Sequence, residues 1–254
     1  MTVAIVRELD LDKLVLLKGS HKEDSQFCVM EAVAYIAGEK WSDSPQCASG
    51  VIAAFMRRWN DGMNDEDRQL LKPYIPRLVG TAAPKAIERQ RAYLAADWCC
   101  RVAVPKLYRR NGWIEEAERL EQLLEVVNEE TSRAAGIGLR SAAEVARKFR
   151  SERRAQLEAK LRNLFIGDAW AAGDAWAAGA AWAAGAASLL DKIAAKVKEI
   201  KTANPQASVY DPIYSLVYTE MRPRYDELVK DLKVEMQRSA FDLLERMLTV
   251  GEVA

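Results

Sequence analysis

Histidine is nearly missing from this chain of 254 residues, which contains only His21. Histidine is the side chain that most often carries protons at neutral pH and a frequent zinc ligand, so its scarcity leaves little room for either chemistry. The chain also lacks the GxxxxGK[ST], GxGxxG and HExxH motifs of nucleotide-binding and metalloprotease sites. These absences predict a protein without a cofactor, a bound metal or catalytic residues, and they argue against an enzyme.

Net charge is missing too, because 37 basic and 37 acidic residues cancel. The chain as a whole therefore exerts no general attraction on nucleic acid or on an anionic membrane, and any such binding requires a local patch. Long apolar runs are also lacking. The uncharged stretch 175–190 has 16 residues, fewer than the roughly 20 that span a bilayer, and consists mostly of alanine and glycine. We expect no membrane association.

Cysteine is scarce, and its four positions contain no CxxC pair of the kind that zinc sites use: Cys28, Cys47, Cys99 and Cys100. Charges near the start interrupt any apolar signal-peptide core, so we expect a cytoplasmic protein with free thiols. Cys28 is the one candidate nucleophile, since a helix N-terminus lowers a thiol pKa. No histidine follows it in the chain, however, so we interpret Cys28 as a small core residue.

The chain is rich in residues that favour the starts and ends of helices. Asp24 or Ser25 can cap a helix that ends at Gly38, and Ser44 followed by Pro45 predicts the start of a second helix that closes at residues 60–62. Asn64 can cap a third helix, which Pro73 ends or kinks, and Pro84 starts a longer one. After Pro105 and Gly112, apolar residues at helical spacing predict a helix over 113–130.

Beyond residue 130 the amino-acid composition changes: residues 139–202 contain no proline and are rich in alanine, leucine and charged helix formers. We therefore predict an all-α fold with a compact module of short helices over 1–130 and a bundle of long Ala-rich helices over 131–254. The last helix is expected from about Pro223 to Leu248, with an apolar seam near heptad spacing. The seam can pair within the chain or with a second copy, which leaves a homo-oligomer open.

Two expected helices carry opposite charge. Residues 113–130 hold seven Glu against one Arg, a net of −6, and residues 139–163 hold eight Lys and Arg against three Glu, a net of +5. One interpretation is an antiparallel pair with complementary flanks. The other is a basic face that contacts nucleic acid or an acidic protein through Arg147, Lys148, Arg150, Arg153 and Arg154.

A six-residue repeat, DAWAAG DAWAAG AAWAAG, occupies residues 168–185. Successive tryptophans, Trp170, Trp176 and Trp182, would face directions about 120° apart on an α-helix, so no single stripe results. The repeat can be buried among neighbouring helices, or its rings can anchor a partner protein. Membrane insertion is the least favoured alternative, given the short uncharged run.

Polar and aromatic residues gather at the expected helix ends of the first module: Trp41, Asp43, Trp59, Asn60, Asp61, Asp67 and Arg68. Helix caps and an Asp to Arg pair explain them structurally. Alternatively, they form a shared polar groove that binds a small ligand, a substrate or a partner segment.

These positions also carry a resemblance. Residues 15–105 resemble a family of uncharacterised α-helical proteins from bacteriophages and bacteria, with matches at Cys28, Glu31, Ala32, Gly38, Glu39, Trp41, Ser42, Asp43, Pro45, Cys47, Trp59, Asn60, Asp61, Arg68, Leu78 and Gly80. The resemblance implies a phage or mobile-element origin and a host cytoplasm, and it carries over no catalytic residues. The alanine-rich helices and the tryptophan repeat lie outside it.

The leading functional hypothesis is a non-catalytic interaction protein with a protein partner, such as a phage accessory factor that binds and inhibits a host macromolecule, for example a defence complex. The first alternative is a nucleic-acid-binding protein that uses the basic helix 139–163. The second is a small-ligand binder or enzyme that uses the polar turns of the N-terminal module.

Overall fold

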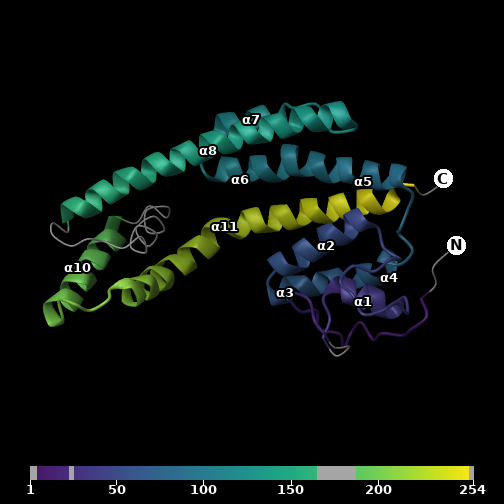
Figure 1. Cartoon of the computed structure of the whole chain (residues 1–254), viewed down its shortest axis with the longest axis horizontal. Helices are drawn as coiled ribbons and strands as arrows, with labels where there is room; N and C mark the ends of the chain where they lie inside the picture. Colours follow the sequence, from purple (N-terminus) through teal and green to yellow (C-terminus); the bar gives the residue numbers. More distant parts are fainter. Residues whose placement is uncertain (1–4, 23–25, 165–186, 252–254) are drawn as a thin grey trace. The chain divides into compact units, whose positions relative to one another are not determined.

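The computed structural model describes residues 5–22, 26–164 and 187–251, and in this part of the chain the fold is all-α, as predicted. Figure 1 shows the helices, with short ones near the N-terminus and long ones later in the chain. The β interaction among these residues is a single isolated parallel bridge between Leu16 and Phe27. No helix within the described residues is long and apolar enough to cross a membrane.

The helical elements follow in this order: α1 Val29–Ile36, α2 Gly50–Gly62, α3 Asp65–Arg68, the 3-10 helix η1 Gln69–Tyr74, α4 Ile75–Leu78, α5 Lys85–Trp98, the π-helix η2 Cys99–Ala103, α6 Val104–Arg110, α7 Ile114–Glu121, α8 Glu129–Leu164, α10 Ala187–Ala203 and α11 Tyr210–Thr249. They divide into two compact units, each made of separate stretches of chain. Unit 1 comprises residues 1–103, 123–135 and 239–254, and unit 2 comprises 104–122 and 136–238. The sequence division at residue 130 follows chain order, whereas these units are discontinuous.

The core of unit 1 is built from elements far apart in sequence. The N-terminal segment contributes Leu14 and Leu16, and α1 is apolar almost all round and buried along most of its length. The last turns of α11 complete the same cluster with Leu243, Leu244 and Met247, which are at most 1% exposed. The C-terminal end of α11 is therefore an integral part of the unit that the N-terminal helices form.

A buried arginine secures that end of α11. Arg91 on α5 donates from Nε to the Met247 carbonyl at 3.0 Å and from Nη1 to the Thr81 carbonyl at 2.6 Å. Its Nη2 donates to the Val250 carbonyl at 3.3 Å, and Glu88 balances its charge at 2.8 Å. The last carbonyls of a helix have no partner within the helix, so a cationic donor satisfies them and favours the negative helix end.

Several helix boundaries lie close to where the sequence predicted them. Gly38 adopts a positive φ of 72° directly after α1, α2 closes at Gly62, and the Asn64 side chain caps α3 by accepting from the Asp67 amide at 2.7 Å. The predicted start at residues 24–25 is wrong, because α1 begins at Val29 and Cys28 supplies its cap.

The predicted start of the second helix at Ser44 and Pro45 is also wrong. The N-cap of α2 is Ser49, whose hydroxyl accepts from the Ile52 amide at 3.2 Å. The same hydroxyl donates to Glu88 on α5 at 2.7 Å, so a tertiary contact reinforces this cap. Residues 44 and 45 lie in the connection that precedes it.

Pro105 lies inside a helix and does not interrupt it. The five-residue π-helix Cys99–Ala103 directly precedes α6, in which Pro105 is buried, so helical backbone runs from Lys85 to Arg110. Proline removes one backbone donor and crowds the preceding turn, and a locally wider π turn relieves both effects.

The helix predicted over 113–130 ends early, at Glu121. The buried carboxylate of Asp97 accepts the Val126 amide at 2.9 Å, and Val126 is 1% exposed. This contact holds the following segment in a non-helical path and leaves Leu124 75% exposed. The Asn128 side chain then accepts from the Thr131 amide at 2.9 Å where α8 begins.

Within unit 2, α6 and α7 pack against each other, and the Trp113 ring lies edge-on to both Tyr108 and Phe149. Ala142 and Ala146 form the buried side of α8. The final helix was expected from about Pro223, but α11 already begins at Tyr210 and continues through that proline.

Candidate functional site

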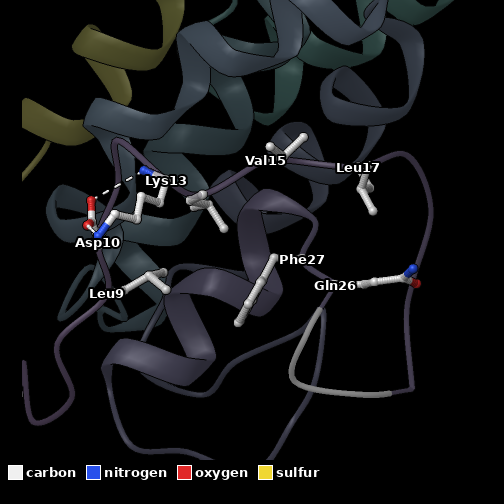
Figure 2. A pocket seen from close by; sticks show the side chains of 8 residues that line it. Leu9, Asp10, Lys13, Val15, Leu17, Gln26 and Phe27 are labelled. Carbon is white, nitrogen blue, oxygen red and sulfur yellow. Dashed lines mark hydrogen bonds and ion pairs between the residues drawn. The ribbon is translucent and has the colours of Figure 1, made fainter.

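An open groove lies on the N-terminal part of unit 1. It has a volume of about 510 Å3 and is lined by Leu9, Asp10, Lys13, Leu14, Val15, Leu17, Gln26 and Phe27. Figure 2 shows Val15 and Leu17 on one side of the groove and Leu9 and Phe27 on the other. Its walls are therefore mainly apolar.

The segment over residues 14–17 is extended, so its side chains alternate between two directions. Leu14 and Leu16 are 7% and 0% exposed and join the core, whereas Val15 is 61% exposed at the groove. A half-exposed strand usually shows polar residues on its outer side, and here that side is aliphatic. The segment thus presents apolar surface to the core and to solvent.

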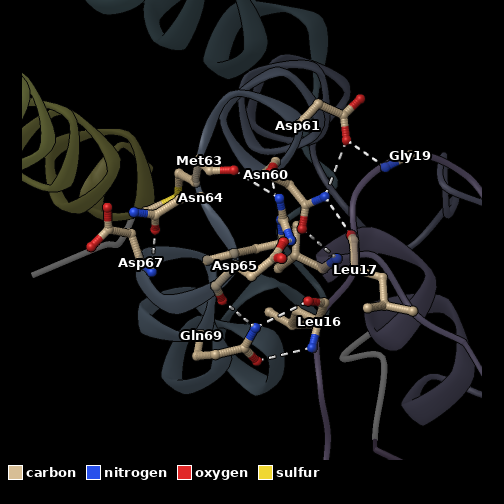
Figure 3. A network of polar contacts seen from close by, with 12 residues as sticks. Leu16, Leu17, Gly19, Asn60, Asp61, Met63, Asn64, Asp65, Asp67 and Gln69 are labelled. Atoms are coloured by element: carbon tan, nitrogen blue, oxygen red, sulfur yellow. Dashed lines mark hydrogen bonds and ion pairs between the residues drawn. The ribbon is translucent and has the colours of Figure 1, made fainter. Parts of the chain in front are cut away.

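The groove wall is held from behind through its backbone. The Gln69 side chain accepts the Leu16 amide at 2.9 Å and donates to the Leu16 carbonyl at 3.0 Å. The Asn60 side chain donates to the Leu17 carbonyl at 2.9 Å, and the Leu17 amide donates to the Phe27 carbonyl at 2.8 Å. Figure 3 shows the contacts of Gln69 and Asn60, two side chains that hold the wall and do not line the groove.

A buried guanidinium supports this arrangement. Arg68 is 2% exposed and donates from Nε to the Asn60 carbonyl at 2.8 Å and from Nη2 to the Met63 carbonyl at 2.7 Å. Its Nη1 pairs with Asp65 at 2.6 Å. Arg68 closes the end of α2 in the same way that Arg91 closes the end of α11, and it fixes the position of Asn60.

A buried carboxylate holds the chain on the C-terminal side of residues 14–17. Glu31 on α1 is 1% exposed; its Oε1 accepts the His21 amide at 2.5 Å, and its Oε2 accepts the Cys28 amide at 2.7 Å. The His21 ring Nδ1 lies 2.8 Å from Oε2, and the Trp41 indole donates to the His21 carbonyl at 2.7 Å. Together these bonds tie residue 21 and the start of α1 to one side chain.

The thiol of Cys28, beside Glu31, is unreactive. Its sulfur accepts the Glu31 amide at 3.5 Å, completing a capping box in which Cys28 takes the usual place of serine. Burial first, and the neighbouring Glu31 carboxylate to a smaller extent, raise the pKa of Cys28 to about 12. A thiol that stays protonated at neutral pH is not a nucleophile. Cys28 is a core residue, 2% exposed.

The structure brings together three of the predicted site residues, Asn60, Asp61 and Arg68, and uses them internally. Asp61 accepts the Gly19 amide at 2.8 Å. Asp67 lies in α3, where its amide donates to Asn64. These groups support the groove from outside and do not line it.

The other predicted residues serve separate contacts. The Trp41 ring packs on Phe27, and the Trp59 ring packs on Phe55 and Phe241. Asp43 accepts the Ser44 hydroxyl at 3.0 Å. Trp170, Trp176 and Trp182 lie outside the described residues. Among the basic residues of the alternative hypothesis, Arg147 and Lys148 are exposed on α8, and Arg150, Arg153 and Arg154 lie further along that helix.

No family model, curated protein or solved structure matches this chain. The groove must therefore be interpreted from its own geometry. Within the described residues, no three His, Cys, Asp or Glu side chains gather as a metal site would require.

Sequence reasoning missed the groove because its polar supports lie far along the chain. Gln69 is 53 residues from Leu16, and Asn60 is 43 residues from Leu17. One local signal was available: the run Leu14 to Leu17 is wholly apolar and lies between Lys13 and Lys18. A short apolar run between charged residues is typical of an extended segment with both sides covered.

Proposed function

We propose that the chain is a non-catalytic protein-binding module, and that the groove of unit 1 takes a short apolar segment of a partner protein. The observation that supports this is an aliphatic wall in which the backbones of Leu16 and Leu17 are hydrogen-bonded by residues behind them, while the side chain of Val15 is left 61% exposed. A wall that is already ordered loses little entropy when a partner binds.

The shape of the groove favours a polypeptide over a small molecule. Small-molecule sites usually enclose most of the ligand surface and hold a few converging polar groups. This groove is open, and its charged rim residues Asp10 and Lys13 pair with each other at 3.1 Å. A neutralised rim attracts neither sign of charge, so the occupant we propose is uncharged and aliphatic or aromatic.

The resemblance of residues 15–105 to phage and bacterial proteins supplies the setting of the proposal. In that setting the partner is a host macromolecule, such as a defence complex, which the chain inhibits by occupying its surface. Expression of the chain in bacteria that carry a defined defence system should then restore the plating of a restricted phage, and a groove variant should not.

The binding proposal itself is tested with purified protein. A displayed library of random short peptides, selected on the full chain, should yield sequences rich in Leu, Ile and Phe. Val15→Glu should abolish binding of the selected peptides, because it places a charge in the apolar groove at an exposed position that folding tolerates.

Leu124→Glu is the matched control, since Leu124 is 75% exposed in unit 1 and lies outside the groove. It should leave peptide binding unchanged. A selection without enrichment, or equal binding by the Val15→Glu protein, would show that the groove is not a binding site.

A further inference from the structure

Three cations on the described part of α8 lack carboxylate partners. Arg140, Arg147 and Lys148 are exposed and form no ion pair with any residue that the structure describes. One turn into the same helix, Arg133 pairs with Glu129. The three cations are thus a surface feature of unit 2 that the fold itself does not neutralise.

The acidic helix α7, which the sequence suggested as a partner for these cations, forms ion pairs with other residues. Glu121 of α7 pairs with Arg109 of α6, with Nη2 to Oε2 at 2.5 Å, and Glu118 lies 3.9 Å from the same arginine. Arg119 takes Glu115 at 3.5 Å and Glu116 at 3.9 Å. The carboxylates of α7 therefore neutralise arginines of α6 and α7, and the cations of α8 keep their charge.

Helical register places the cations together. Arg140 and Arg147 are seven residues apart, about two turns, which leaves them roughly 20° apart around the helix and about 10 Å apart along it. Ala142 and Ala146, on the opposite side, are 6% and 2% exposed and pack inward. The side of α8 that holds these cations, together with the exposed Glu144 between Arg140 and Arg147, therefore faces solvent.

We infer that this side of α8 binds the phosphate backbone of nucleic acid, independently of base sequence. Arginine suits phosphate because its planar guanidinium donates two parallel hydrogen bonds to one phosphate group. Cations repeated along a straight helix match a linear polyanion. The exposed neighbours Ile137 and Val145 are aliphatic and offer no hydrogen bond to a base edge, so backbone contact is the mode that fits.

Fluorescence anisotropy of the full chain with a labelled single-stranded DNA and with its duplex, titrated from about 25 to about 200 mM salt, tests the inference. Binding should weaken steeply with salt. The double variant Arg147→Glu with Lys148→Glu should bind at least about tenfold more weakly, and the slope of log K against log salt should become shallower by about two, roughly one per lost phosphate contact.

The matched control is Lys85→Glu with Arg89→Glu, two exposed cations one turn apart on α5 of unit 1. It should leave both affinity and slope unchanged, and circular dichroism should show that each variant is folded. Absence of binding at the lowest salt, or an equal loss in the control, would overturn the inference. Polyglutamate that binds the wild-type chain when neither DNA does would also overturn it and assign the surface to an acidic protein.

Discussion

Replacing Glu31 by glutamine tests how far one buried carboxylate holds the N-terminal segment in place. Glu31 accepts three hydrogen bonds, from the amides of His21 and Cys28 and from the His21 ring. Glutamine has nearly the same shape but only one accepting oxygen. Whichever way its amide turns, at least one donor that is buried or part-buried then faces the NH2 group.

The expected cost follows from these bonds. A hydrogen bond to a charged group contributes about 1.5 to 3 kcal/mol, and a buried donor left without a partner costs a further 1 to 3 kcal/mol or so. One bond lost and one donor opposed predict that Glu31→Gln lowers the free energy of unfolding by about 3 kcal/mol. Domain stabilities are about 5 to 15 kcal/mol, so the change is a large fraction of the total.

Urea unfolding followed by circular dichroism measures this loss. Glu39→Gln is the graded control, because Glu39 also accepts two amides at 2.7 Å, from Gln46 and Cys47, but is only partly buried. Water can hydrogen-bond to the amide that loses its partner in this variant, so Glu39→Gln should lower the free energy of unfolding by only about 1 kcal/mol. Equal costs for the two variants would refute the reasoning that burial of Glu31 decides the effect.

Three further outcomes are expected. Arg91→Met leaves the final carbonyls of α11 without donors and should lower the free energy of unfolding by about 3 kcal/mol in the same urea assay. A thiol reagent at alkaline pH should label Cys99 faster than the other three cysteines of the native protein, because Cys99 is exposed and the other three are buried. Burial raises the pKa of all four thiols, that of Cys28 to about 12 and those of Cys47 and Cys100 to about 11; equally fast labelling of all four would contradict the described packing. Hydrogen bonding to Arg77 holds the pKa of Glu245 below its ordinary value, so this pair stabilises the fold at neutral pH and loses its contribution as the pH falls through the lowered pKa; Glu245→Gln should remove that part of the acid sensitivity of the melting temperature.

The features that were readable from the sequence are those that local chemistry decides. Gly38 ends α1 because a positive φ suits glycine, and Asn64 caps α3 with an amide only three residues away. The all-α class was predicted from such residues at helix ends, together with a composition rich in helix-forming residues.

The features that were missed depend on distant partners. Ser49 caps α2 in preference to Ser44 because Glu88 takes its hydroxyl and the Thr81 hydroxyl takes its amide. The segment after Glu121 leaves the helix because Asp97, on another element, binds the Val126 amide. No pattern of spacing reveals such pairings, since each joins residues about thirty or more positions apart.

The polar turns illustrate the same limit within one site. Sequence reasoning singled out Asn60, Asp61 and Arg68 among the polar residues of the turns, and the structure shows them bonded to one another and to residues 17 and 19. It could not show that they point away from the apolar groove that they support, because the direction of a side chain depends on the path of the segment it holds.

The closing turns of α11 have a consequence for synthesis on the ribosome. Residues 1–103 leave the ribosome long before Leu243, Leu244 and Met247, and residues 104–238 must be made in between, which takes roughly 7 to 27 s at ordinary translation rates. Throughout that interval the apolar side of the N-terminal helices lacks its final layer. A nascent chain of this design should therefore attract chaperones until its last turns arrive, and a ribosome stalled before residue 239 should leave unit 1 open to protease.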